Sequence, residues 1–192
     1  MGMAKIEIRS IEEAKKVQIP DLTEDHINDF NNLKKIMQFS NESSTSKLHK
    51  IYNLTDKIAS FIAPYMVCEK GCNHCCKINV HLSSIEAGYI QKNLGITSNS
   101  GNSISSGYSE KKQPCSFLSN SGTCGIYEHR PFACRTYHAL DNPAFCEDVD
   151  MEHITYTSES NGMLNKIFYM IQTLNNNQAI RDVRDFFPNG KL

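Results

Sequence analysis

The sequence predicts a small, mainly α-helical single domain over residues 1–192, with at most short strands and an irregular cysteine-rich centre. Three observations support this prediction. Apolar residues recur at the helical period on both sides of the centre. All eight cysteines lie between Cys68 and Cys146. A chain of 192 residues with 40% hydrophobic content can bury a core. We therefore expect a helical part, 1–64, a cysteine-cluster part, 65–150, and C-terminal helices, 151–192.

Two amphipathic helices are expected before the cysteines. Capping residues at 21–23 precede the first helix, whose apolar face consists of Ile27, Phe30, Leu33, Ile36 and Met37. A polar stretch at 41–46 separates it from the second, whose face consists of Leu48, Ile51, Tyr52, Thr55, Ile58 and Ile62. Pro64 ends the second helix. Together they predict a helical hairpin that packs against the cysteine-rich part.

Shorter elements follow the first cysteines. Residues 77–82 alternate like a short strand, and the capping-box pattern Ser83 to Glu86 opens a helix that stops at Gly95. Residues 97–107 are rich in Ser, Asn and Gly, which predicts a surface loop. Pro131 is expected to open a short helix that carries Cys134. The last third predicts a helix over 163–174 and a shorter one from 180.

The start of the chain bears on the redox state of the thiols. It is charged and mixed, without the apolar core of a signal peptide, and no stretch is apolar enough for a membrane span. We therefore expect a cytoplasmic protein that does not enter the membrane, where thiols stay reduced and bind metal rather than form disulfides. With 20 basic and 21 acidic residues and no basic stripe, nothing indicates nucleic acid binding.

The cysteine spacing predicts a metal site. Cys68, Cys72 and Cys75 form C-x3-C-x2-C, which lets a loop curl so that the sulfurs converge. Because adjacent side chains generally point apart, Cys75 and Cys76 are expected to address different sites or different metals, or one of the two supports the ligands from outside or acts as a redox thiol. Four thiolates suit zinc or an iron–sulfur cluster such as [4Fe-4S], and eight could make two sites. The candidate ligands are Cys68, Cys72, Cys75, Cys76, Cys115, Cys124, Cys134 and Cys146.

These motifs resemble a known family. Cys68 to Cys76, the segment 114–118, the run from Cys124 to Arg135 and the later Cys146 are similar to the CxxCxxCC, or YkgJ-like, zinc- or iron-chelating domains. The resemblance covers about residues 65–150, and the first gap here is three residues rather than two. It implies a metal or iron–sulfur site on the cysteines. The domain also occurs in flagellin lysine N-methylases, which implies that some relatives use S-adenosylmethionine.

Other polar residues flank the cysteines. Arg130 and Arg135 are candidate cofactor-binding residues that offset thiolate charge, and the alternative is that Arg130 belongs to a turn and Arg135 pairs with a carboxylate. The histidines that could replace a thiolate as ligand are His74, His81, His129 and His138. Four acidic residues near Cys146 are expected in a solvated loop, or as ligands if the metal is iron: Asp141, Glu147, Asp148 and Asp150.

Three classes of function remain open. The first is a structural or carrier site for zinc or iron. The second is an iron–sulfur enzyme that modifies a protein, peptide or small molecule. The cysteine gap resembles that of radical S-adenosylmethionine enzymes, although His74 replaces the usual aromatic residue and the chain lacks the succession of strand–helix units of that fold. No glycine-rich nucleotide loop supports an enzyme of any kind. The third is a redox sensor in which Cys75 and Cys76 are oxidised. A metal ion is the expected partner, and the substrate and any protein partner stay open.

Overall fold

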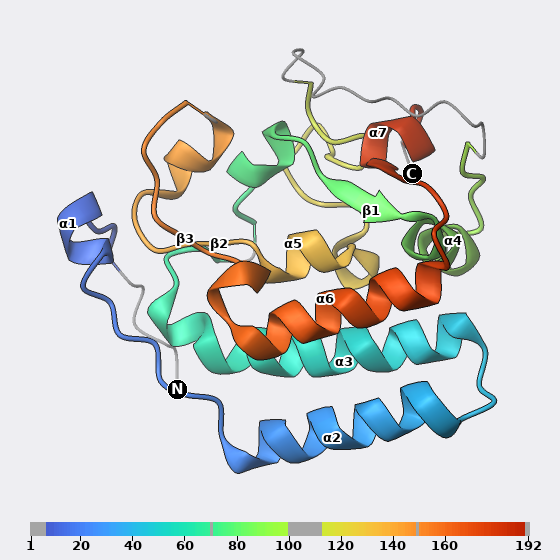
Figure 1. Cartoon of the computed structure of the whole chain (residues 1–192). Helices are drawn as coiled ribbons and strands as arrows, with labels where there is room; N and C mark the ends of the chain where they lie inside the picture. Colours follow the sequence, from blue (N-terminus) through green and yellow to red (C-terminus); the bar gives the residue numbers. More distant parts are fainter. Residues whose placement is uncertain (1–6, 70, 100–112, 149, 191–192) are drawn as a thin grey trace.

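The computed structural model describes residues 7–69, 71–99, 113–148 and 150–190. Three long helices lie side by side, with α3 (Ser44–Ile62) between α2 (Glu24–Phe39) and α6 (Gly162–Asn175) (Figure 1). The short helices and loops that carry the cysteines lie above this helical layer in the view of Figure 1. The mainly α-helical fold with short strands and the helical hairpin are confirmed.

Helix α3 has a capping residue at its start and apolar residues at the helical period along one face. The hydroxyl of Ser43 accepts a hydrogen bond from the backbone N–H of Ser46 at 3.2 Å, which caps the first turn. The apolar face predicted from the sequence is buried, with Leu48, Ile51 and Ile58 fully enclosed. The helix ends at Ile62, and Pro64 follows in the 3-10 helix η1 (Ala63–Tyr65).

Helix α4 (Ser84–Leu94) begins and ends as the sequence predicts. The Glu86 carboxylate accepts hydrogen bonds from the Ser83 backbone N–H at 2.9 Å and from the Ser83 hydroxyl at 2.7 Å. Gly95 ends the helix in the left-handed region, with φ of 65°.

Two predicted boundaries were wrong. The strand expected over 77–82 is β1 (His81–Ser83), because residues 74–77 form the 3-10 helix η2 (His74–Lys77). The short helix expected from Ile180 starts at Val183 as α7 (Val183–Phe186). Residues 180–182 instead form β4 (Ile180–Asp182), antiparallel to β1 with His81 opposite Asp182. This pairing joins residues about a hundred positions apart, which local periodicity does not reveal.

The remaining elements are short. They are α1 (Ile11–Ala14), η3 (Tyr127–His129), α5 (Phe132–Thr136), β2 (His138–Ala139), η4 (Pro143–Glu147), β3 (Thr155–Tyr156) and η5 (Ser158–Ser160). Strands β2 and β3 pair antiparallel. Pro131 precedes α5, which confirms the short helix that carries Cys134. Of the predicted loop over 97–107, residues 100–107 lie outside the described residues.

Two apolar cores flank the cysteine segments. The larger joins α2, α3 and α6, and includes Phe132 of α5. The smaller includes Leu82, Ile90, Phe117, Ile126, Val183, Phe186 and Phe187. Cys115 and Cys124 pack against the smaller core, so their position depends on tertiary packing rather than on the local loop alone.

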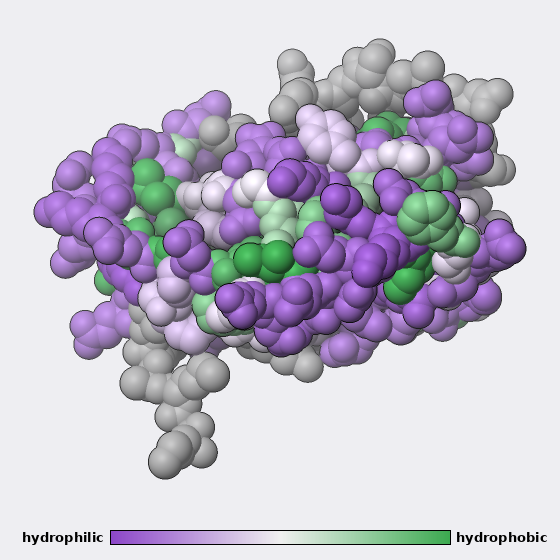
Figure 2. All heavy atoms as spheres, turned by 60° about the horizontal axis from the view of Figure 1, so that its bottom comes forward, coloured by the Kyte–Doolittle hydropathy of each residue, from purple (hydrophilic) through white to green (hydrophobic). Residues whose placement is uncertain are grey.

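The surface is mostly polar in the view of Figure 2, where hydrophobic residues appear in small separate patches. Within the described ranges, the helices that form are too short or too polar to cross a membrane.

Candidate metal centre

The segment Cys68–Cys76 and the segment around Cys115 are joined through their backbones. The N–H of Cys115 donates to the carbonyl of Cys76 at 2.7 Å. The amide of Asn73 donates to the carbonyl of Gly122 at 3.0 Å. A Cβ at Gly122 would lie 2.5 Å from that amide nitrogen, and φ there is 78°, so this close approach requires glycine.

Arg184, a residue that our sequence reasoning did not identify, holds the same two segments. Its guanidinium donates to the carbonyl of Ile78 at 3.1 Å and to that of Pro114 at 3.3 Å. Asp182 accepts from the guanidinium with both carboxylate oxygens at 2.9 Å. Arg184 lies 106 positions from Ile78, so no local pattern marks it as part of this site.

Four cysteines form what we call the first thiol group: Cys68, Cys72, Cys75 and Cys146. The Cys68 thiol hydrogen-bonds to Cys72, which lowers the pKa of Cys72 and raises that of Cys68. Burial raises the pKa of Cys146 to about 12, and the charge of Cys72 acts in the same direction. Tyr137 hydrogen-bonds with Cys146 and lies within electrostatic reach of Cys75 and Cys68.

Hydrogen bonds hold the first thiol group in place. The backbone N–H of Ala139 in β2 donates to the sulfur of Cys68 at 3.0 Å. Glu147 of η4 joins the helix that carries Cys146 to η2, because its carboxylate accepts from His74 at 3.0 Å and pairs with Lys77. The chain therefore ties η4, and with it Cys146, to the turn that carries Cys75.

The other four cysteines form the second thiol group: Cys76, Cys115, Cys124 and Cys134. Burial raises the pKa of Cys134, and its neighbours Cys115, Cys76 and Cys124 raise it further. Burial also raises the pKa of Cys115, to about 11. The two groups adjoin, because the side chains of Cys75 and Cys76 hydrogen-bond to each other. The premise that adjacent side chains point apart does not hold for this pair, and the assignment of Cys75 and Cys76 to different metal sites stays a prediction.

Three of the cysteines share a local geometry. At Cys72, Cys115 and Cys124 the sulfur accepts a hydrogen bond from the backbone N–H two residues further on. Such bonds favour the thiolate over the thiol and orient the sulfur. These turns are therefore suited to hold thiolate ligands.

A cavity lies between the two thiol groups, and cysteines together with apolar residues form its wall. This cavity of about 120 Å³ is lined by six of the eight cysteines: Cys72, Cys75, Cys76, Cys115, Cys124 and Cys134. Within the described ranges, no three His, Cys, Asp or Glu side chains stand close enough together to hold a metal ion without moving. Zinc and iron both bind thiolate sulfur, so the chemistry of these cysteines fits either metal. Binding requires the cysteine side chains to move closer to one another.

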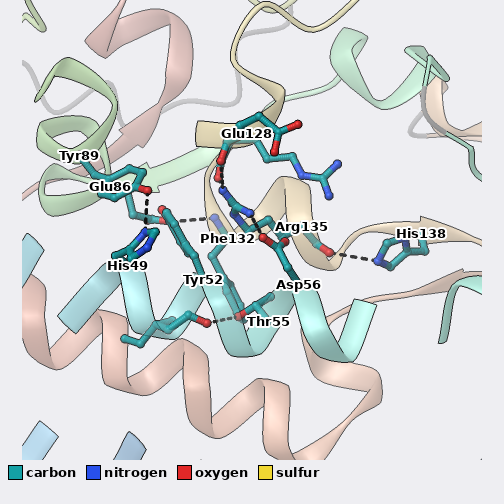
Figure 3. Close-up of polar contacts among 12 residues, drawn as sticks. His49, Tyr52, Thr55, Asp56, Glu86, Tyr89, Glu128, Phe132, Arg135 and His138 are labelled. Atoms are coloured by element: carbon teal, nitrogen blue, oxygen red, sulfur yellow. Dashed lines mark hydrogen bonds and ion pairs between the residues drawn. The ribbon is translucent and has the colours of Figure 1, made fainter. Parts of the chain in front are cut away.

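Arg135 makes buried contacts that connect parts of the fold. Only 3% of its side chain is exposed, and it forms an ion pair with Asp56 of α3. Its guanidinium also donates to the carbonyls of Arg130 and Glu128, at 2.8 and 2.7 Å (Figure 3). The expected pairing of Arg135 with a carboxylate is therefore observed, and its role in binding a cofactor stays a prediction.

Arg130 lies nearer to the thiols. Its guanidinium stands 4.1 Å from the ring centre of Tyr127. Its charge lowers the pKa of Cys134 and of Cys124, against the larger effect of burial, which raises both. Within the part of the chain that the structure describes, its buried Nε has no hydrogen-bond partner.

The four histidines named from the sequence have separate surroundings. His74 contacts Glu147, and His81 lies in β1 with an exposed side chain. His129 contacts the ring of Tyr89, with the ring centres 6.0 Å apart. The ring Nε2 of His138 bonds the carbonyl of Arg135 at 3.0 Å (Figure 3), and burial, with the charge of Arg130, lowers the pKa of His138 to about 4.

A fifth histidine, His153, was missed. Its Nδ1 lies 2.6 Å from a carboxylate oxygen of Asp141, and its Nε2 lies 3.1 Å from the sulfur of Cys146. Asp141 is fully buried, so our expectation of a solvated acidic loop was wrong at this position. The contact joins residues twelve positions apart, and each lies next to one of the paired strands β2 and β3 rather than in a single local motif.

A larger pocket opens beside the first thiol group. It has a volume of about 500 Å³ and lies between α3 and the cysteine segment, with Cys68, Cys72 and Cys75 in its wall. Tyr127, Arg130 and His138 also line it. It is large enough for a small-molecule ligand.

Comparison with known proteins gave one match. The family described as "CxxCxxCC: Putative zinc- or iron-chelating domain" matches residues 67–163. This range begins just before Cys68 and includes all eight cysteines together with His153. No match was found among curated proteins or among solved structures.

Proposed function

Because this chain belongs to the CxxCxxCC family of zinc- or iron-chelating domains, we propose that it binds zinc or iron through its two thiol groups. The observation that supports this most directly is the cavity of about 120 Å³ with six cysteines in its wall. The proposed ligands come from the first thiol group, around Cys72 and Cys146, and from the second, around Cys76 and Cys134.

The gathering of the thiols supports metal binding over simple packing. Burial raises the pKa values of Cys146 and Cys134, and repulsion from the charge of neighbouring cysteines raises them further. A cation removes that repulsion and takes the place of the protons. We therefore propose that metal binding draws the thiols inward and contributes to the stability of the fold.

The first experiment is metal and acid-labile sulfide analysis, with an absorption spectrum, on protein purified without oxygen. Zinc without sulfide supports a structural or carrier role. Iron with stoichiometric sulfide supports an iron–sulfur cluster. Protein that holds neither metal, and that takes up neither when it is offered, would overturn the proposal.

Substitutions separate the two thiol groups. We expect Cys72→Ser and Cys134→Ser each to lower the bound metal without abolishing it, and the double variant to hold none. Each single variant should also unfold at a lower temperature, because metal-binding free energy contributes to folding. Thr55→Ser, in the α3 core away from the thiols, serves as a control for folding effects. Unchanged metal content in both cysteine variants would contradict the assignment.

One observation favours a second candidate function, an iron–sulfur enzyme that uses S-adenosylmethionine to modify a protein or peptide. The pocket of about 500 Å³ places open space directly beside Cys68, Cys72 and Cys75. Calorimetric titration of the metal-loaded protein with S-adenosylmethionine tests this function. Binding that is lost when Arg130 is replaced by Gln supports it, and the absence of any binding would exclude it.

A further inference from the structure

We propose that His153 is a nitrogen ligand of the metal that Cys146 binds, held in position by Asp141. This inference rests on the proposed function and specifies the ligands of the first thiol group. It gives that site three sulfurs, from Cys68, Cys72 and Cys146, and one nitrogen.

The orientation of the His153 ring follows from its partners. One oxygen of the Asp141 carboxylate accepts from the backbone N–H of Ile154 at 2.8 Å, and the other lies 2.6 Å from Nδ1 of His153. A carboxylate only accepts hydrogen bonds, so the proton of the ring lies on Nδ1. The lone pair of Nε2 then points toward the sulfur of Cys146, at 3.1 Å.

This arrangement is the one that metal-binding histidines show in proteins. A histidine ligand generally donates its other ring N–H to a carboxylate or a backbone carbonyl, which fixes the ring. His153 does so with a carboxylate that is itself fully buried. Burying a carboxylate is costly unless its partners are well placed, so the Asp141 and His153 pair is unlike a chance surface contact.

The pair lies next to the paired strands β2 and β3. Ala139 of β2 lies opposite Thr155 of β3, and the N–H of Leu140 donates to the carbonyl of Ile154 at 2.9 Å. Asp141 follows this paired segment, and its carboxylate contacts His153 and the backbone of Ile154. The Phe145 ring packs edge-on against the imidazole, with ring centres 6.3 Å apart.

A cysteine, a histidine and an aspartate in a row could also form a hydrolase triad, but access argues against it here. Cys146 is 4% exposed and the His153 side chain 8%. Neither of the two cysteine-lined pockets includes Cys146, His153 or Asp141 in its wall. A nucleophile needs room for a substrate beside its sulfur, whereas a metal ligand needs only room for the ion.

Four donors complete a tetrahedral zinc site. If His153 is the fourth ligand, Cys75 is not a ligand of this site. Its side chain hydrogen-bonds to Cys76 instead. The adjacent cysteines then have distinct roles, and Cys75 becomes the thiol that the first site can lose without losing its metal.

X-ray absorption spectroscopy at the zinc edge tests the inference on the full chain loaded with zinc alone. We expect sulfur at about 2.3 Å, nitrogen at about 2.0–2.1 Å and the multiple-scattering pattern of an imidazole ring. His153→Gln should lose the imidazole pattern, whereas His138→Gln, a matched change at another partly buried histidine near the thiols, should keep it. Cys75→Ser should keep both the zinc and the imidazole pattern.

The wild-type spectrum decides the question even if His153→Gln does not fold. Zinc bound by sulfur alone, with no imidazole pattern, overturns this inference and leaves the proposed function standing. No zinc uptake at all overturns the proposed function itself. Alkylation of Cys146 by iodoacetamide in the zinc-loaded protein would also overturn the inference, since a ligand thiolate buried with its metal is protected. Asp141→Asn should keep the imidazole pattern but weaken zinc retention against a chelator by about 10–100-fold.

Discussion

The guanidinium of Arg135 forms an ion pair with Asp56, and this contact joins the cysteine-bearing helix α5 to helix α3 (Figure 3). The same guanidinium lies over the ring of Tyr52, 4.3 Å from its centre. The cysteine-rich part is thus attached to the helical layer through a buried cation, and the attachment can be tested independently of any metal.

Asp56→Asn should destabilise the protein, because it leaves the buried charge of Arg135 without its carboxylate. We expect a loss of about 1–3 kcal/mol in the free energy of unfolding, measured with urea. Asp56 is partly exposed, so water compensates for some of the lost contact. Asp29→Asn, which removes an exposed partner of Lys57 in α3, should cost clearly less. Equal losses in the two variants would show that burial of Arg135 does not govern this contact.

Glu86→Ala should be more costly, because this carboxylate serves two structural elements besides its own helix. It accepts from the Tyr52 hydroxyl at 3.0 Å and from the backbone N–H of Phe132 at 2.9 Å, in addition to the capping box with Ser83. We expect a loss of about 2–5 kcal/mol in the free energy of unfolding.

Glu13→Ala in α1 is the matched control for Glu86, because Glu13 forms the same capping box with Ser10 in an exposed position. Its effect should be much smaller. If thermal unfolding shows similar shifts for the two variants, the buried contacts of Glu86 are not what stabilises the fold.

Glu147→Ala should weaken metal retention without removing a thiol. The change releases His74 and Lys77, so η4, with Cys146, is no longer tied to η2. We expect faster loss of zinc to a chelator, followed by stopped-flow absorbance. Asp150→Ala, three positions further on, should release zinc at the wild-type rate, and equal rates in all three proteins would refute this role of Glu147.

The ion pair between α2 and α3 should appear in the acid titration. The hydrogen bond and charge of Lys57, 2.5 Å from Asp25, lower the pKa of Asp25. A lowered carboxyl pKa adds stability above the pKa of the unfolded chain, and that stability is lost as the pH falls through the folded value. In Lys57→Met the pKa of Asp25 should rise toward its ordinary value, measured by carboxyl NMR. Lys50→Met, which removes the partner of Glu42 instead, should leave Asp25 unchanged.

Local signals explain how far the fold could be predicted. The capping box at Ser83 and the glycine at Gly95 place both ends of α4, because caps act within one turn. The apolar period of α3 matches its buried face for a similar reason. In contrast, Ile180 has a local pattern that suits either helix or strand, and it became a strand only because β1 offered backbone partners.

Some features of the candidate site could be predicted from the sequence, and others could not. The thiols themselves and the resemblance to a chelating family follow from residue type and spacing. Arg184 does not, since it meets Ile78 from 106 positions along the chain. His153 lies only seven positions from Cys146, but its contact with Asp141 is formed beside the paired strands and has no local sequence pattern.

The sequence by itself determined the donor chemistry of this protein, because eight thiols in one stretch of the chain are a property of composition and spacing. Only the tertiary structure decided how those thiols are divided into two groups and which buried histidine faces Cys146. The physical reason is that the ligands of one metal must lie close together in space. Strand pairing and core packing bring them together, and neither leaves a pattern in the nearby sequence.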